Sequence, residues 1–149
     1  MTTRKVKICA PDRPGLFSKI AGLFTLNHLN ILDAQVFTWD NNIAVDEFEV
    51  TPPADRIFES EKWDKAEKQM AEVLCDKLDI ALALKKKEAA APPVRNYLRG
   101  KPDKVVIDNT SSSFFTIVEV YTYDFPGILF KITDALYRCG FDIDRKSVV

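Results

Sequence analysis

Histidine and cysteine are scarce in this chain of 149 residues. His28 is the only histidine, and the three cysteines, Cys9, Cys75 and Cys139, lie far apart in the sequence. This set has no spacing typical of a zinc site, and an odd number of scattered cysteines does not indicate a disulfide framework. We therefore expect reduced thiols, no metal site and a cytoplasmic location.

The chain also lacks a strong charge excess and long apolar runs. Its formal net charge is −1, which gives no electrostatic reason to expect nucleic acid or an anionic membrane as a partner. No apolar run approaches the roughly 18 residues of a membrane-spanning helix. The N-terminal residues lack the apolar core of a secretory signal. With 46% hydrophobic and 29% charged residues, the composition is that of a globular protein of one domain or two small ones.

The sequence does contain an internal repeat. Residues 12–17 read Asp-Arg-Pro-Gly-Leu-Phe, and residues 124–129 read Asp-Phe-Pro-Gly-Ile-Leu, a shift of 112 positions from 12 to 124. The same shift pairs Lys19 with Lys131, Ile20 with Ile132, Ile31 with Ile143 and Val36 with Val148. Each motif follows a strand pattern and precedes an amphipathic helix pattern. The repeat therefore indicates two copies of one supersecondary unit.

The first copy reads strand, helix, strand, strand, helix, strand. Alternating apolar residues predict strands over 5–10, 31–40 and 43–51, and the run Lys-Val-Val-Ile-Asp predicts a short strand over 104–108. Apolar residues at helical spacing predict helices over 16–26 and 61–84. We interpret residues 85–102 as an irregular connector, because a run of lysines and then an Ala-Pro segment break the helical pattern. In the second copy we expect a strand over 114–121, a helix over 128–139 and a strand over 141–149.

One of these strands has an expected core face, and a second shows a clear alternation between two faces. In the strand over 31–40 we assign the core face to Leu32, Ala34, Val36 and Thr38. In the strand over 43–51, the residues that alternate onto one face are Ala44, Asp46, Phe48 and Val50.

The second copy is incomplete, since its third strand, second helix and fourth strand are missing. We divide the chain into a first domain over 5–110, with an insertion at about 85–103, and a partial second domain over 113–149. Half a sheet cannot cover its own apolar face. Either the chain is a piece of a longer protein or a partner subunit completes the sheet, and we favour the first.

The order of elements, with Asp-Arg-Pro-Gly-Leu-Phe between the first strand and the first helix, resembles the ACT domain. This resemblance implies an α+β, ferredoxin-like βαββαβ fold, with an antiparallel sheet and two helices on one face. Three further features narrow the resemblance to one group of ACT-containing proteins. They are the tandem copies, the insertion and the run Val-Val-Ile-Asp-Asn-Thr-Ser over 105–111. They resemble the C-terminal tandem ACT region of the bifunctional enzymes that uridylylate and de-uridylylate the PII nitrogen-signalling protein.

The resemblance implies a regulatory function. In that family the tandem ACT region senses glutamine, and the nucleotidyltransferase and phosphohydrolase domains, with their Mg²⁺, lie upstream. This chain has neither the paired-aspartate nor the His-Asp signature of those domains. We therefore expect a non-catalytic segment without a cofactor of its own. It would bind a small amino-acid effector, with glutamine favoured, and would act on PII through its parent enzyme.

The start of the first helix is the expected binding site. Gly15 begins a helix whose first amides lack intrahelical partners, and this positive end suits a carboxylate. Asp12 can accept from a ligand ammonium, and Asn30 offers both a donor and an acceptor. In ACT domains the effector lies between this turn and the second strand of a neighbouring copy, in cis or in a partner subunit. The ligand-binding residues that the resemblance implies are Asp12, Arg13, Pro14, Gly15, Leu16, Asn30 and Ile31 in the first copy, and Asp124, Pro126, Gly127, Ile128, Asp142 and Ile143 in the second.

The two copies are not equivalent as binding sites. Phe125 stands where the first copy has a basic residue, and Asp142 stands in the place of Asn30. An extra carboxylate is unfavourable beside the carboxylate of an amino acid, so we favour the first copy.

Two alternatives stay open. Turn chemistry alone explains Asp-x-Pro-Gly, so the alternative to a sensor is an interaction module whose copies pair through their strands and bind no metabolite. A free-standing enzyme is disfavoured, because the sequence shows no acid–base or metal constellation near the turns.

Overall fold

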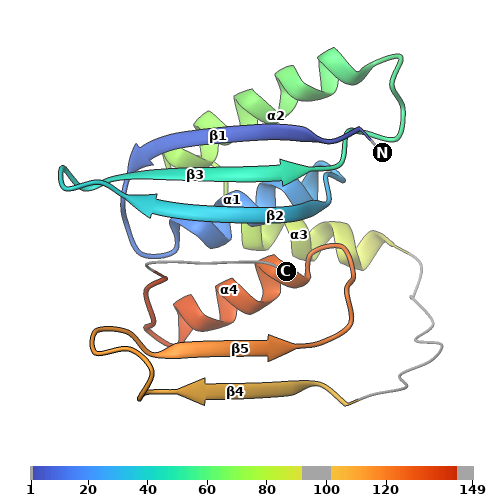
Figure 1. Ribbon diagram of the computed structural model, residues 1–149. Coiled ribbons are helices and arrows are strands. Elements are labelled where there is room, and N and C mark those ends of the chain that lie inside the picture. The colour runs from blue at the N-terminus through green and yellow to red at the C-terminus, as the bar shows by residue number, and fades with distance from the viewer. Residues whose placement is uncertain (1, 92–101, 144–149) are drawn as a thin grey trace. The chain divides into compact units, whose positions relative to one another are not determined.

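A computed structural model describes residues 2–91 and 102–143 of the chain. The elements (Figure 1) are β1 (Arg4–Pro11), α1 (Leu16–Leu26), β2 (Ile31–Thr38), β3 (Ile43–Val50), α2 (Glu59–Leu74), α3 (Ile80–Ala90), β4 (Lys104–Asp108), β5 (Ile117–Tyr121) and α4 (Ile128–Arg138). They form two compact units. The larger unit comprises Met1–Ala91 with Pro126–Val149, and the smaller one is Pro92–Phe125.

The larger unit is built on a three-stranded antiparallel sheet with the order β1-β3-β2. β3 is central and pairs with β1 from Arg4↔Val50 to Pro11↔Ile43. β2 pairs with the other edge of β3, up to Thr38↔Ala44. The alternation of apolar residues along these strands gives the sheet one buried face, as the sequence predicts.

A bulge corrects the predicted core face of β2. The register with β3 shifts between Ile31 and Asp33, so that Leu32 is the extra residue. Leu32 is consequently 39% exposed, while Ile31 packs against the core in its place. Ala34 and Val36 are buried as expected, and Thr38 is exposed.

α1 supplies most of the side chains that cover the sheet. Ile20 and Leu23 are almost completely buried. The rings of Phe17 and Phe24 lie against Phe48 of β3, with ring centroids 5.4 Å and 5.0 Å apart, respectively. Aromatic pairs at such distances add to the stability gained from burying their area. The predicted helix over 16–26 is confirmed.

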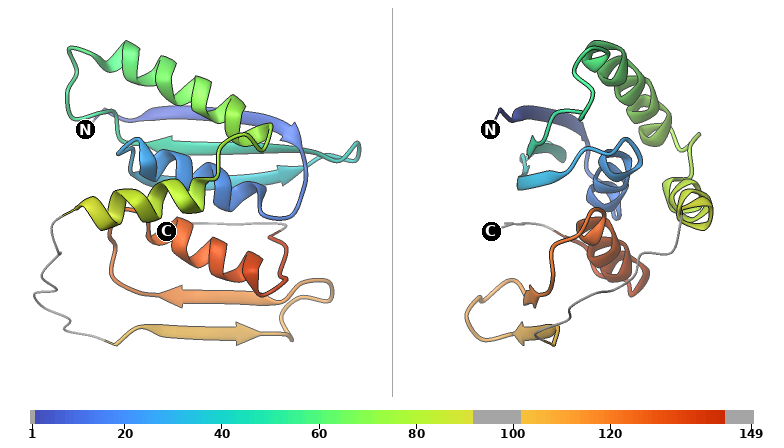
Figure 2. Two further views of the ribbon diagram at one scale, coloured as in Figure 1. Left: turned by 180° about the vertical axis from the view of Figure 1, so that it is seen from behind. Right: turned by 90° about the vertical axis from the view of Figure 1, so that its right-hand side faces the viewer.

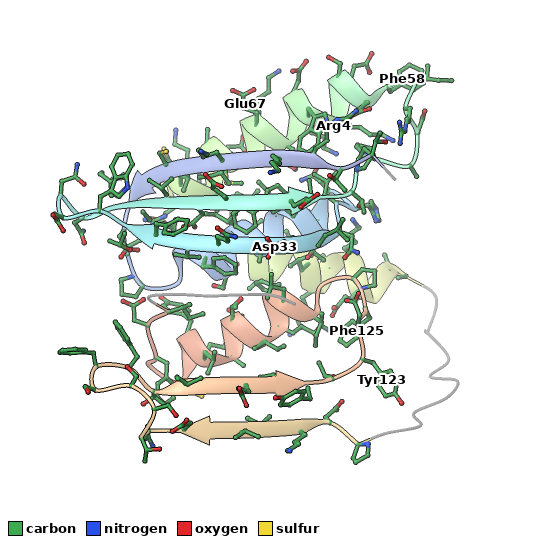
Figure 3. The ribbon with its side chains drawn as sticks, viewed as in Figure 1. Arg4, Asp33, Phe58, Glu67, Tyr123 and Phe125 are labelled. Atoms are coloured by element: carbon green, nitrogen blue, oxygen red, sulfur yellow. The ribbon has the colours of Figure 1, made fainter. Side chains whose placement is uncertain are left out.

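α2 lies on the same side of the sheet as α1 (Figure 2). Its apolar stripe, with Trp63, Met70 and Leu74, packs against the core around α1. At its start, Glu59 accepts a hydrogen bond from Arg4 of β1, with 2.8 Å between Nε and Oε1. Figure 3 labels Arg4 on β1. The stripe is the pattern that the sequence predicts for an amphipathic helix.

The predicted single helix over 61–84 is wrong, because two helices replace it. α2 ends at Leu74, and Asp76 adopts a left-handed conformation with φ +56°. Asp79 then caps the start of α3, where its Oδ1 accepts from the Leu82 amide at 3.0 Å. A side-chain oxygen at this position satisfies an orphan amide and so favours a new helix start. Residues 85–90 of the predicted irregular connector are helical, and residues 92–101 lie outside the described part.

α4 packs on α1 in the larger unit. A Cβ built on Gly15 would lie 2.9 Å from the Tyr137 ring, and a Cβ on Gly127 would lie 3.0 Å from Cγ2 of Thr25. The start of each helix therefore meets the end of the other, and the pair is antiparallel. Gly15 and Thr25 correspond to Gly127 and Tyr137 at the repeat spacing of 112 residues. Such reciprocal contacts are those of an isologous pair.

The C-terminal part of the chain matches the predictions incompletely. The predicted helix over 128–139 is present as α4. Residues 141–143 of the predicted last strand are not in a strand. Residues 144–149 of that strand lie outside the described part, as does Val148 of the repeat.

The smaller unit contains the antiparallel pair β4 and β5, in register from Lys104↔Tyr121 to Asp108↔Ile117. Asp108 holds the connecting turn, because its carboxylate accepts from the hydroxyl and amide of Ser111 and from Thr110. These hydrogen bonds keep the pKa of Asp108 well below its usual range.

The pairing of β4 corrects the predicted sheet. The strand over 104–108 exists, but its partner is β5 and not the sheet of β1 to β3. A short turn favours pairing between strands that are adjacent in sequence. The α+β class with an antiparallel sheet and helices is confirmed, and the domain bounds 5–110 and 113–149 stay a prediction.

No helix in the described residues is long and apolar enough to span a bilayer.

Candidate functional site

A small cavity lies at the start of α1 in the larger unit. The empty space among its side chains is about 350 Å³, including the part that is open to solvent. Only a small part of this space is wide enough for a water molecule, so a whole amino acid enters only if rim side chains move. The lining residues are Asp12, Arg13, Gly15, Leu16, Phe17, Ser18, Val36, Ala44, Asp46, Thr133, Tyr137, Phe141, Asp142 and Ile143.

The turn before α1 brings backbone amides to this cavity. Gly15 adopts φ +79°, which a glycine accepts without strain, and α1 begins directly after it. The Leu16 amide donates to the Arg13 carbonyl at 3.1 Å, so one predicted anion-binding donor is already used. No acidic side chain stands in the first turn of α1 to neutralise the positive helix end.

Arg13 lines the cavity, but its guanidinium is engaged at the end of α2. Nη1 lies 2.7 Å from Oδ2 of Asp76, and Nη2 donates to the Leu74 carbonyl at 3.1 Å. Lys19 also donates to Asp76, and these hydrogen bonds, that of Lys19 first, lower the pKa of Asp76. Arg13 therefore ties the turn before α1 to α2, and a carboxylate ligand would have to compete for it.

Asp46 is the unusual residue of the cavity. It lies on the core face of β3, between Ala44 and Phe48, and is only 1% exposed. Its Oδ1 has no hydrogen-bond partner among the described residues. Burial, with a smaller effect from the charge of Asp12, raises the pKa of Asp46 from its ordinary value of 3.8 to about 6. A buried carboxylate without a partner is unfavourable for folding.

The hydroxyl groups of two lining residues, Ser18 and Thr133, are satisfied by carbonyl groups of their own helix or its cap. Ser18 Oγ donates to the Gly15 carbonyl at 2.9 Å, and Thr133 Oγ1 donates to the Leu129 carbonyl at 2.8 Å. Ionic groups therefore dominate the electrostatics of the cavity. Three of the lining residues are aspartates, and Arg13 is the only cationic residue among those of the described chain that line it.

Residues 5–57 match the model of the ACT domain family. The chain contains an ACT domain. No solved structure matches the chain.

This ACT-containing chain is also similar to three proteins named bifunctional uridylyltransferase/uridylyl-removing enzyme. It is 35% identical to that of Rhodospirillum rubrum over 97% of its own length, and 37% identical to that of Azospirillum brasilense over 97%. The protein of Gluconobacter oxydans is 32% identical over 98%. The chain spans only 15–16% of the length of these proteins.

The structure gathers some of the predicted site residues of the ACT domain and separates others. The residues that line the cavity together are Asp12, Arg13, Gly15, Leu16, Asp142 and Ile143. Asp12 also accepts from Thr38 Oγ1, at 3.4 Å. The first motif thus meets residues from the corresponding part of the second repeat, although the strand predicted for that part is not formed over 141–143.

The other predicted residues do not line this cavity. Pro14, Asn30, Pro126, Gly127 and Ile128 are not part of the lining. Ile31 instead pairs with Val50 and packs on the core. Asp124 belongs to the smaller unit.

Sequence reasoning missed Asp46, Thr133 and Tyr137. A signal for Asp46 was present, because it is the one charged residue in an otherwise apolar alternation along β3. No signal marked Thr133 or Tyr137, because their positions depend on how α4 packs against α1.

Proposed function

We propose that the chain is a regulatory segment that binds an amino acid, with glutamine favoured, and controls a parent uridylyltransferase/uridylyl-removing enzyme acting on PII. One observation supports this proposal above the others. The cavity combines the turn of the first motif, at Asp12 and Gly15, with Asp142 of the second repeat. This is the combination that the ACT resemblance implies for an effector site.

We further propose that residues 113–149 belong to a second ACT copy. The reciprocal contacts of Gly15 with Tyr137 and of Gly127 with Thr25 support this, because two related copies would meet in this manner. Catalysis and its Mg²⁺ would belong to the remaining length of the parent enzyme, since the chain spans only 15–16% of the proteins it resembles. A cytoplasmic location is part of the same proposal.

Thermal denaturation with each of the twenty standard L-amino acids tests amino-acid binding. A ligand at about 100 times its dissociation constant should stabilise the folded chain by ~2.7 kcal/mol. We expect the largest increase in melting temperature with glutamine. No increase with any amino acid would contradict the proposal and would favour an interaction module without a metabolite.

A pair of glycine substitutions tests the position of the site. Gly15→Ala places a Cβ 2.9 Å from the Tyr137 ring at the edge of the cavity. Gly140→Ala is the matched control, because Gly140 has a similar φ of +83° but no atom within 4 Å of the added Cβ. Both variants carry a backbone strain of about 1–2 kcal/mol. We expect Gly15→Ala to lose the stabilisation by amino acid and Gly140→Ala to retain it; an equal stabilisation of both would place the ligand elsewhere.

A further inference from the structure

We propose that Asp46 binds the α-ammonium group of the effector and so restricts the cavity to ligands with a free amino group. This inference rests on the proposed function, since it names the contact that selects amino acids as a class. It adds a residue of β3 to a site that sequence reasoning placed on the turn before α1 and on the start of the second strand.

The burial of Asp46 is the first step of the argument. The residue lines the cavity, yet it is 1% exposed and its Oδ1 is without a hydrogen-bond partner among the described residues. Its neighbours on the same face of β3, Ala44 and Phe48, are buried and apolar. An apolar side chain at position 46 would serve the core better, because an unsatisfied buried carboxylate destabilises a fold. The carboxylate is therefore best explained by a group that enters the cavity.

The surrounding charges define that group. Asp12 faces the cavity from the turn before α1, and Asp142 faces it from the segment after α4. Arg13 is the only cationic residue lining the cavity in the described part of the chain, and its guanidinium is bonded to Asp76 and to the Leu74 carbonyl. Among the described residues, no side chain of the lining therefore compensates Asp46. A cationic ligand group would do so, through charge-assisted hydrogen bonds.

The size and the position of the cavity favour an ammonium group. The part of the space that is wide enough for a water molecule is small, and an ammonium group is about that size. The three aspartates of the lining do not fit a metal ion, because no three His, Cys, Asp or Glu side chains of the described residues are placed so that they could hold one. The start of α1 lines the same cavity at Gly15 and Leu16. A zwitterion can thus direct its carboxylate to the positive helix end and its ammonium to Asp46.

Calorimetric titration of the full chain tests the proposal with two ligands. The ligands are L-glutamine and glutaramic acid, which is glutamine without its α-amino group. If another amino acid gives the largest thermal shift, that amino acid and its deaminated acid replace them. A charge-assisted hydrogen bond corresponds to about 10- to 100-fold in Kd. We expect the wild-type chain to prefer glutamine to glutaramic acid by about this factor.

Two variants complete the experiment. Asp46→Asn keeps the shape of the side chain and removes its charge, and we expect it to weaken glutamine about 10- to 100-fold while leaving glutaramic acid within about threefold. Glu47→Gln is the matched control, because Glu47 is the next residue of β3 and its ion pair with Lys7 lies on the other face. We expect this control to bind both ligands as the wild type does.

The outcomes separate the two proposals. If wild type binds glutamine and Asp46→Asn binds it equally well, the inference is overturned and the proposed function stands. If wild type binds no amino acid, both are overturned. A wild-type chain that binds glutamine and glutaramic acid equally also overturns the inference, and this measurement does not depend on the folding of any variant.

Discussion

Asp46 shows how a single residue can oppose the stability of the fold that contains it. The larger unit buries this carboxylate beneath α1 and gives its Oδ1 no hydrogen-bond partner in the described part of the chain. Natural proteins tolerate such groups where binding requires them, and stability is lost in exchange. If Asp46 serves a ligand, its removal should stabilise the empty protein.

The stability difference between wild type and Asp46→Asn should depend on pH. The pKa of Asp46 is about 6 in the folded chain and 3.8 in the unfolded one. Well below pH 3.8 the residue is neutral in both states and the difference should be small. Between pH 3.8 and 6 the unfolded chain ionises Asp46 while the folded chain keeps it neutral, so the wild type should lose up to roughly 3 kcal/mol relative to Asp46→Asn, and the difference should level off above pH 6.

Urea unfolding between about pH 3 and pH 7.5 measures this difference. Glu47→Gln serves as the control. The hydrogen bond with Lys7 lowers the pKa of Glu47, so this residue should stabilise the wild type as the pH rises, which is the opposite of the trend expected for Asp46. A difference between wild type and Asp46→Asn that is independent of pH would show that Asp46 is already neutral or already paired.

At the scale of elements, α1 is the helix on which the larger unit is assembled. One side of α1 packs on the sheet, a second side packs on α3 and a third packs on α4. Gly22 permits two of these contacts: a Cβ built there would lie 2.3 Å from Cγ2 of Ile80 and 2.8 Å from the Phe130 ring. Glycine is otherwise unfavourable inside a helix, so close packing explains its presence.

Gly22→Ala should therefore destabilise the chain although it improves helix propensity. Alanine gains about 1 kcal/mol in a helix interior, but the collision with Ile80 and Phe130 should exceed that gain and leave a net loss of about 1–3 kcal/mol. Ile80→Ala removes the closest colliding atom. We expect the double variant to be less destabilised than the sum of the two single variants, as chemical denaturation can measure; additive losses would contradict the collision.

The elements were predictable from the sequence where local signals suffice. The helix over 16–26 and the strand over 104–108 have the predicted bounds, because periodicity, proline and glycine mark them. The break between α2 and α3 was missed. The Asp79 cap and the left-handed Asp76 that produce it lie within a continuous apolar stripe.

Strand pairing and the site depended on tertiary structure. The bulge at Leu32 brings Ile31 onto the core in place of Leu32, and no residue type in the sequence predicts it. β4 has the short apolar run of an ordinary strand, which does not identify its partner. Asp12, Gly15 and Asp142 were found through the family resemblance. The sequence marks Asp46 as a charge in an apolar alternation, but only the structure shows that its carboxylate is buried and that its Oδ1 has no partner among the described residues.

At the scale of the whole chain, the larger unit combines residues from both ends of the sequence. Phe130 of α4 packs against both hydrophobic clusters, the one beneath the sheet and the one around Leu23 and Val73. The ACT domain match ends at residue 57. The structure therefore indicates that residues beyond the match contribute to the core.

Phe130→Ala should destabilise the chain by about 2–4 kcal/mol, because it removes an aromatic ring from two clusters at once. Phe114→Ala is the control, since Phe114 is 88% exposed in the smaller unit; we expect a change within about 0.5 kcal/mol. Thermal unfolding of both variants is the measurement. Equal losses would mean that α4 does not pack on α1 in solution.

The joining of α1 and α4 within one chain has a consequence for how the cavity responds to dilution. Residues around the start of α1 and residues of α4 line the cavity together. Because both helices belong to one chain, their association is intramolecular, and its effective concentration is set by the connecting backbone. The fraction of molecules with an assembled cavity should then be the same in a scarce protein as in an abundant one. A single proteolytic cut between α3 and α4 would make the assembled fraction depend on protein concentration, since the fragments that carry α1 and α4 would separate on dilution.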